Sequence, residues 1–158
     1  MTGGPGDRTL ATAFRAADHS PGLLLWQVGN RWQAAQRAAL APLGLTHVQF
    51  VLLASLTWLG DEGPVSQRRL ADHAATDPMM TSQVLRTLAD RDLVVREAHP
   101  NDRRARALRV TTAGAALANR AVRVVEECDR QFFEVLDDDE TAFTAALLRL
   151  RDRTAAAR

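Results

Sequence analysis

The chain has 158 residues, a length that fits one compact domain. Its composition, 46% hydrophobic and 25% charged, excludes a wholly disordered chain. No run approaches about 18 uninterrupted apolar residues, and the sequence therefore predicts no membrane span. The N-terminus lacks a basic segment followed by an apolar core, so we expect no secretory signal and a cytoplasmic location. The 20 basic and 19 acidic residues leave a net charge of +1, so only their positions can indicate a nucleic-acid partner.

The residue types exclude several kinds of site. Every basic residue is Arg, which forms bidentate contacts with phosphate and guanine that Lys cannot form. The single Cys128 excludes an intrachain disulfide and disfavours a cysteine-based zinc site. The four histidines show no metal-ligand spacing. We therefore expect neither a metal nor a cofactor.

The first third of the chain predicts a tail and two helices. Residues 1–20 are rich in Gly, Pro, Ala and Thr and predict a flexible tail. Apolar residues recur at helical spacing over 21–41, and a Pro and a Gly end that helix. A second helix over 47–58 ends at the glycine-rich turn 60–63.

The middle of the chain predicts two short helices in succession. Val65 is expected to form a single strand rung, and Ser66 caps a short helix that ends near Ala74. Asp77 followed by Pro78 is a strong start signal for the next helix, which we expect to end near residue 90.

A hairpin and two helices complete the chain. Strands over 93–97 and 106–110 flank a turn over 98–104, where Pro, Asn and Asp gather. A long helix from 112 to about 136 and a last helix ending near 154 follow. The predicted fold is mainly α with a small β-hairpin: a helix-turn-helix followed by a wing. The flanking helices are too apolar to stand alone and come together within one chain or between two.

The second helix of the pair has side chains suited to reading DNA. With Met80, Val84 and Leu88 turned inward, the opposite face carries a polar set at spacings of three and four. Gln83 can present a donor and an acceptor to adenine, and Arg86 can reach guanine or a phosphate. An ordinary amphipathic surface helix would also have such a face. The outward set is Met79, Ser82, Gln83, Arg86 and Asp90.

Arginines at the hairpin tip support the DNA interpretation. They are Arg103, Arg104 and Arg106. A protruding loop of arginines suits the minor groove, where the negative potential is concentrated. The carboxylate of Asp102 can hold the guanidinium of Arg104 by a forked pair of hydrogen bonds, although a solvated charged turn is the alternative. Arg68 and Arg69 lie where phosphate contacts are expected, or else are a pair of solvated charges.

Three stretches around the helix pair and a set of residues in the wing carry a resemblance to a known family. The stretches are residues 45–50, 65–71 and 77–82. The wing residues concerned are Asp102, Arg104, Val110, Thr111 and Gly114. With these residues the sequence resembles the MarR family of bacterial winged-helix regulators, over about 23–150. Val110 stands where Leu or Ile is usual in that family, which is a conservative departure.

The resemblance implies a homodimeric transcriptional regulator, more specifically a ligand-responsive repressor on double-stranded DNA. Residues 21–44 and 112–158 are then the dimerisation helices, and 45–111 the DNA-binding lobe. Each subunit places a recognition helix and a wing on a pseudo-palindromic operator. Half-sites about 34 Å apart need a rigid two-fold dimer, which agrees with the apolar flanking helices.

The resemblance also implies a small aromatic or anionic effector, bound where the dimerisation helices meet the lobe. Trp26, Asn30, His47 and Phe50 can line such a cleft, unless they are a packed helix junction. Peroxide-sensing relatives carry their reactive cysteine near the N-terminus, which Cys128 does not match. Its acidic neighbours raise the pKa of its thiol, so we expect an inert residue.

Two other function classes remain as alternatives. A winged-helix protein-interaction module without DNA binding would suit the near-neutral charge. An enzyme is not expected, because the sequence has no G-x-S-x-G, no H-E-x-x-H and no phosphate-binding glycine loop.

Overall fold

The computed structural model describes residues 10–155, without the side chains of residues 99 and 102–105. The chain divides into two compact units, Met1–Ala34 and Ala35–Arg158, and each is described by itself. In the first, a 3-10 turn η1 (Ala17–His19) precedes α1 (Pro21–Leu40), which continues into the second. The predicted helix start at Pro21 is confirmed. Of the tail predicted at 1–20, residues 1–9 lie outside the described residues, and 17–19 form η1.

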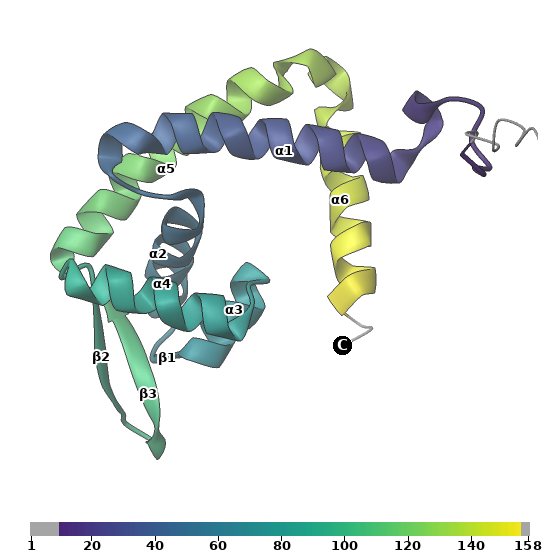
Figure 1. Cartoon of the computed structure of the whole chain (residues 1–158). Helices are drawn as coiled ribbons and strands as arrows, with labels where there is room; N and C mark the ends of the chain where they lie inside the picture. The colour runs from purple at the N-terminus through teal and green to yellow at the C-terminus, as the bar shows by residue number, and fades with distance from the viewer. Residues whose placement is uncertain (1–9, 156–158) are drawn as a thin grey trace, which may run out of the picture. The chain divides into compact units, whose positions relative to one another are not determined.

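The second unit contains the predicted helix pair and wing (Figure 1). After α1, its elements are η2 (Ala41–Leu43), α2 (His47–Gly60), β1 (Val65–Ser66), α3 (Gln67–Ala74), α4 (Pro78–Asp90), β2 (Val94–His99), β3 (Asp102–Val110), α5 (Thr112–Phe133), η3 (Glu134–Asp139) and α6 (Glu140–Ala155). The predicted caps Ser66 and Asp77 are confirmed at the starts of α3 and α4. Thr46 also caps α2, where it forms a capping box with Gln49.

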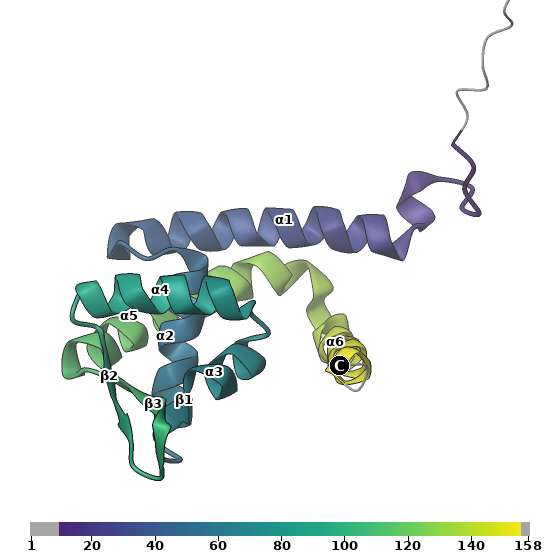
Figure 2. The same cartoon turned by 60° about the horizontal axis from the view of Figure 1, so that its bottom comes forward.

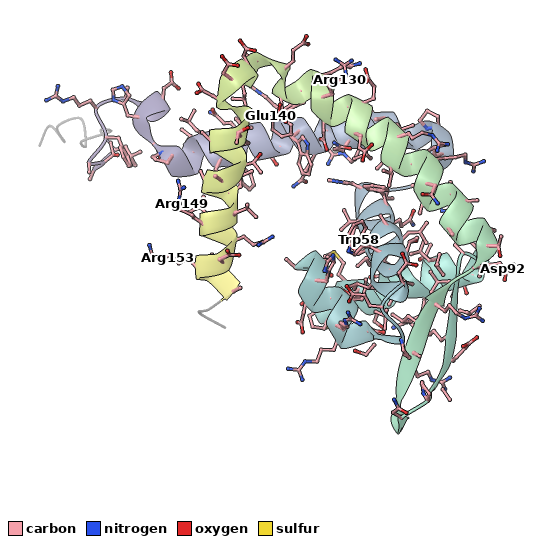
Figure 3. The ribbon with its side chains drawn as sticks, turned by 180° about the vertical axis from the view of Figure 1, so that it is seen from behind. Trp58, Asp92, Arg130, Glu140, Arg149 and Arg153 are labelled. Atoms are coloured by element: carbon pink, nitrogen blue, oxygen red, sulfur yellow. The ribbon has the colours of Figure 1, made fainter. Side chains whose placement is uncertain are left out.

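The core of this unit forms around α2. Leu52, Leu53 and Leu56 are buried there, together with residues from α3, α4, the sheet and the first half of α5. Trp58 is the last residue of the predicted helix 47–58 and is large and apolar, but its side chain is 73% exposed, and Figure 3 labels it on α2. The buried residues Leu52, Leu56 and Leu59 follow the helical spacing of four and three, and Trp58 lies off the face that they form.

The last two helices leave apolar side chains exposed. Phe133 of α5 and Phe143 of α6 have ring centroids 5.9 Å apart and form the packing between these helices. Further along α6, Leu147, Leu148 and Leu150 are exposed, although they would favour burial. The apolar side of α6 is therefore not covered within the described residues.

Three antiparallel strands make a small sheet in the order β1-β3-β2. Val65 of β1 pairs with Leu108 of β3, as the predicted single rung requires, and Arg96 of β2 pairs with Leu108 from the other side. The β2–β3 hairpin extends beyond the helices in both Figure 1 and Figure 2.

The predicted turn over 98–104 was too long. Strand pairing reaches His99 and Asp102, with an irregular step after Ala98, so only two residues remain in the turn. Backbone pairing along the ribbon overrides the weak strand propensity of the residues beside the turn. The arginines at 103, 104 and 106 therefore lie along β3 and not in a loop.

The base of the hairpin is fixed against the start of α5. The Thr111 N–H donates to the Leu93 carbonyl at 3.0 Å, and the Thr111 hydroxyl donates to the Asp92 carbonyl at 2.7 Å. Gly114 lies so close that a Cβ there would overlap the Leu93 carbonyl oxygen and approach Val110 Cγ2 to 2.8 Å. Figure 3 shows Asp92 beside the first turn of α5. Only glycine fits at this contact.

Replacing Gly114 by Ala should therefore destabilise the fold, by about 3 kcal/mol, since overpacking costs about 1–3 kcal/mol and a backbone carbonyl cannot rotate away. This cost exceeds the roughly 1 kcal/mol that Ala gains in helix propensity. Urea unfolding of Gly114→Ala should show a lower midpoint with an unchanged m-value. Gly60→Ala is the matched control, because a Cβ at Gly60 meets nothing within 4 Å. An equal stability of parent and Gly114→Ala would contradict this account of the hairpin base.

Candidate nucleic-acid interface

The N-terminus of α4 is fixed by its cap and by the turn that precedes it. One carboxylate oxygen of Asp77 accepts from the N–H groups of Met79 and Met80, at 2.9 and 3.0 Å. The buried Thr81 hydroxyl donates to the Asp77 carbonyl at 2.8 Å and lies 2.7 Å from the Thr76 hydroxyl. These bonds set the rotation of α4 about its own axis, and with it the face that the helix presents to solvent.

The outward face of α4 contains most of the predicted residues. Met79 is 82% exposed, Gln83 and Arg86 are also exposed, and Ser82 is half-buried. Met80 was expected to point inward but is 41% exposed, and Thr81 is buried in its place.

The observed rotation of α4 about its axis differs from the predicted one because the Thr81 hydroxyl is hydrogen-bonded, so this polar residue can be buried without an unsatisfied group. The inward residues of α4 are Thr81, Leu85 and Leu88, with Val84 half-buried at the edge of the same face.

Ser82 connects α4 to the hairpin. Its hydroxyl accepts from Arg86 Nη2 at 3.5 Å, and its carbonyl accepts from Arg96 Nη2 of β2 at 3.4 Å. No motif in the sequence singles out Arg96. The sequence places it in a strand, but only the strand register and this long-range contact show that its side chain reaches α4.

Two arginines lie at the start of α3. The Ser66 hydroxyl accepts from the Arg69 N–H at 3.1 Å, which fixes this helix start. The Arg69 side chain forms an ion pair with Glu62, and Arg68 lies 3.9 Å from Asp72. Exposed pairs of this kind contribute about 0–1 kcal/mol, so a phosphate can compete for both guanidinium groups.

The hairpin places its basic residues along β3. The predicted forked pair between Asp102 and Arg104 lies outside the described side chains, as does the side chain of Arg103. Arg106 is exposed. Arg109 donates to Glu97 across the hairpin at 2.5 Å, and this hydrogen bond and the carboxylate charge raise the pKa of the Arg109 guanidinium.

The residues predicted to line an effector cleft divide between the two units. Trp26 and Asn30 are exposed on α1 in the first unit, with Trp26 69% exposed. In the second unit, Phe50 belongs to the buried core, and His47 is half-buried at the start of α2.

Polar and charged side chains lie around His47. Burial lowers the pKa of His47, the Asp129 carboxylate opposes that shift, and the Arg37 charge adds to it. Asp129 also accepts from Gln36 Nε2 at 2.6 Å, and the buried Gln36 Oε1 has no hydrogen-bond partner among the described residues.

The pKa of the Cys128 thiol is raised, as the sequence predicts, but the main cause differs from the predicted one. Burial of its side chain is the largest effect that raises the pKa of the thiol, and the Asp129 charge is the second. A raised pKa lowers the reactive thiolate fraction, which agrees with an inert residue.

Searches for other kinds of site in the described residues give two findings. No three His, Cys, Asp or Glu side chains within 10–155 are placed to hold a metal ion. No single helix in that range has the length and apolar composition to cross a membrane, and only the bent pair Pro21–Leu43 and His47–Gly60 meets the criteria when taken together.

Comparisons with known proteins agree on one family. The model of the MarR family matches residues 45–105. The HTH-type transcriptional regulator YdcH of Bacillus subtilis is 40% identical over 121 residues, which cover 76% of this chain and 82% of that regulator.

Solved structures are similar over most of the chain. The structure of CouR from Rhodococcus jostii RHA1 bound to p-coumaroyl-CoA has a TM-score of 0.74 and 27% identity, covering 91% of this chain and 95% of that one. A structure of the transcriptional repressor CouR bound to a 23-mer DNA duplex also has a TM-score of 0.74, with 26% identity, covering 85% of this chain and 94% of that one.

The environment of His47 predicts a pH dependence of stability. Because the pKa of His47 in the folded protein lies below its ordinary value of about 6.5, the imidazole binds its proton more tightly in the unfolded chain. The free energy of unfolding should therefore be largest above that value and fall as the pH drops through it. Urea midpoints from pH 7.5 to 5 should fall more steeply for the parent than for His47→Gln, in which this group cannot titrate. Parallel curves for the two proteins would contradict the assignment.

Proposed function

Since this chain belongs to the MarR family of transcriptional regulators, we propose that it is a homodimeric repressor that binds a pseudo-palindromic operator and responds to a small effector. Its place of action is the cytoplasm. The observation that carries the proposal is the pairing of an exposed polar face on α4 with a projecting, arginine-rich hairpin in the same unit (Figure 2).

In this proposal α4 enters the major groove. An α-helix matches the width of that groove, and side chains near the helix start reach the base edges. Gln83 and Arg86 then contact bases or phosphates, and Met79 touches a thymine methyl group. Ser82 is half-buried and lies beside these residues at the protein–DNA boundary.

The hairpin then enters the adjacent minor groove. Arg103, Arg104 and Arg106 lie along one strand, where they can follow the groove and its phosphates. Arg68 and Arg69, at the start of α3, contact the backbone between the two grooves. The solved complex of the similar repressor CouR with a 23-mer DNA duplex supports DNA as the partner.

The dimer is supported by apolar surface that one chain leaves exposed. Leu24, Leu25 and Trp26 on α1 and the leucines of α6 are exposed, and burying them against a second copy would stabilise the assembly. We therefore assign residues 21–44 and 112–158 to dimerisation and 45–111 to DNA binding. A two-fold axis then sets the half-site spacing at about one helical turn of DNA.

The effector is proposed to bind beside His47, where α1, α2 and α5 supply polar groups. Gln36 and Asp129 lie there, and the unsatisfied Gln36 Oε1 can accept a hydrogen bond from a ligand. CouR bound to p-coumaroyl-CoA supports an aromatic, anionic effector class. Trp26 and Asn30 are exposed on the part of α1 that belongs to the first unit, and their role as ligand contacts stays a prediction from the sequence.

A second candidate function is a protein-interaction module that does not bind DNA. It is favoured by the net charge of +1 and by the acidic partners of Arg69 and Arg109. DNA binding at physiological salt distinguishes the two functions, because a repressor would bind its operator there and the interaction module would not bind DNA.

Selection of a random DNA pool with the purified chain tests the proposed function. We expect an enriched pseudo-palindrome that binds one dimer. Arg104→Ala should weaken operator binding by about 100-fold, since each subunit loses a charged contact of about 1.4 kcal/mol. The slope of log affinity against log salt should become shallower by about 1.8, at about 0.9 for each lost phosphate.

Arg15→Ala is the matched control, since Arg15 is exposed ahead of α1, outside the segments assigned to dimerisation and to DNA binding. It should leave both the affinity and the salt slope unchanged. An unenriched pool would favour the protein-interaction module, and equal operator affinity for parent and Arg104→Ala would show that the wing does not contact DNA.

A further inference from the structure

Arg96 is placed differently from the other arginines of the hairpin. It pairs with Leu108 across β2 and β3, and directly paired residues of an antiparallel sheet point to the same face. Leu108 is buried in the core, so the Arg96 side chain is directed toward the core side of the sheet. Arg106 and Arg109 on β3 are exposed instead.

The guanidinium of Arg96 connects the hairpin to α4. Its Nη2 donates to the Ser82 carbonyl at 3.4 Å, across 14 residues of chain. Ser82 lies in the middle of α4, between Met79 and Arg86 on the exposed face. The bond therefore joins the strand of the wing to the part of the helix that carries the proposed base contacts.

Stability of the fold does not account for an arginine at this position. Arg96 Nε is buried and has no hydrogen-bond acceptor among the described residues, which costs free energy. No ion pair among the described side chains involves Arg96. An apolar side chain of similar length would cover the same surface and leave no buried N–H group without an acceptor.

We propose that Arg96 is a positioning residue, which sets the orientation of the wing relative to α4 so that both reach their grooves at once. The proposal rests on the proposed function, because it concerns the same DNA interface. The wing is otherwise joined to the lobe at its base, around Gly114 and Thr111, and along β1. The Arg96 contact braces the hairpin directly against α4, which the base contacts do not do.

The role predicts opposite effects on stability and on DNA binding. Arg96→Met keeps the length of the side chain and removes the brace. We expect an unchanged or higher thermal midpoint, together with an operator affinity about tenfold lower. Arg96→Lys, which retains one donor for the Ser82 carbonyl, should recover part of the affinity.

A double-mutant cycle with Arg104→Ala separates positioning from direct contact. If Arg96 acts through the wing, Arg96→Met should cost little further affinity once Arg104 is removed. If Arg96 binds a phosphate itself, the two losses add, and the proposal is overturned. Arg91→Met is the matched control: Arg91 Nη1 also donates to a backbone carbonyl, that of Gly44 at 2.9 Å, but does not touch the wing. Its effect should be small and additive.

A measurement without DNA keeps this test separate from the proposed function. Hydrogen exchange of the β2–β3 amides in the free protein should be about tenfold faster in Arg96→Met than in the parent, and unchanged in Arg91→Met. Equal exchange in parent and Arg96→Met overturns the proposal whether or not the protein binds DNA. A parent that binds no DNA overturns the proposed function, and the hydrogen-exchange result then tests by itself whether Arg96 fixes the hairpin against α4.

Discussion

The backbone of Gly114 lies so close to the Leu93 carbonyl that no side chain fits between them, and this approach anchors the hairpin. Thr111 completes the anchor, because its N–H and hydroxyl donate to two successive carbonyls at the start of the hairpin while its hydroxyl also accepts from Gly114. The direction in which the wing leaves the lobe is therefore set at the first turn of α5. A wing that leaves the lobe at a fixed angle can approach DNA together with α4.

The recognition helix is fixed by a separate set of bonds, and the proposed function needs both sets to agree. The cap at Asp77 and the buried Thr81 hydroxyl set the rotation of α4. Arg96 then joins that helix to the hairpin halfway along β2. A rigid pairing of helix and wing lowers the ordering cost of binding, since less conformational freedom is lost when the complex forms.

Local signals in the sequence predicted the elements well, and long-range contacts explain where prediction failed. The caps at Ser66 and Asp77 are satisfied within three residues, so sequence alone places both helix starts. The inward position of Thr81 depends on hydrogen bonds that hydrophobic periodicity does not count. The role of Arg96 needs the register of β2 against β3, which composition does not determine. The length of the hairpin strands was underestimated for the same reason.

Hydroxyl-radical footprinting of the selected operator tests whether the two wings of a dimer enter the minor groove, because the radical attacks the sugars that line that groove. We expect two protected minor-groove patches, placed symmetrically about the centre of the operator, where the two wings lie. Both patches should disappear in Arg104→Ala while the major-groove contacts of α4 remain. Protection confined to one side of the centre, or patches unchanged in Arg104→Ala, would contradict a two-fold assembly that reads DNA with its wings.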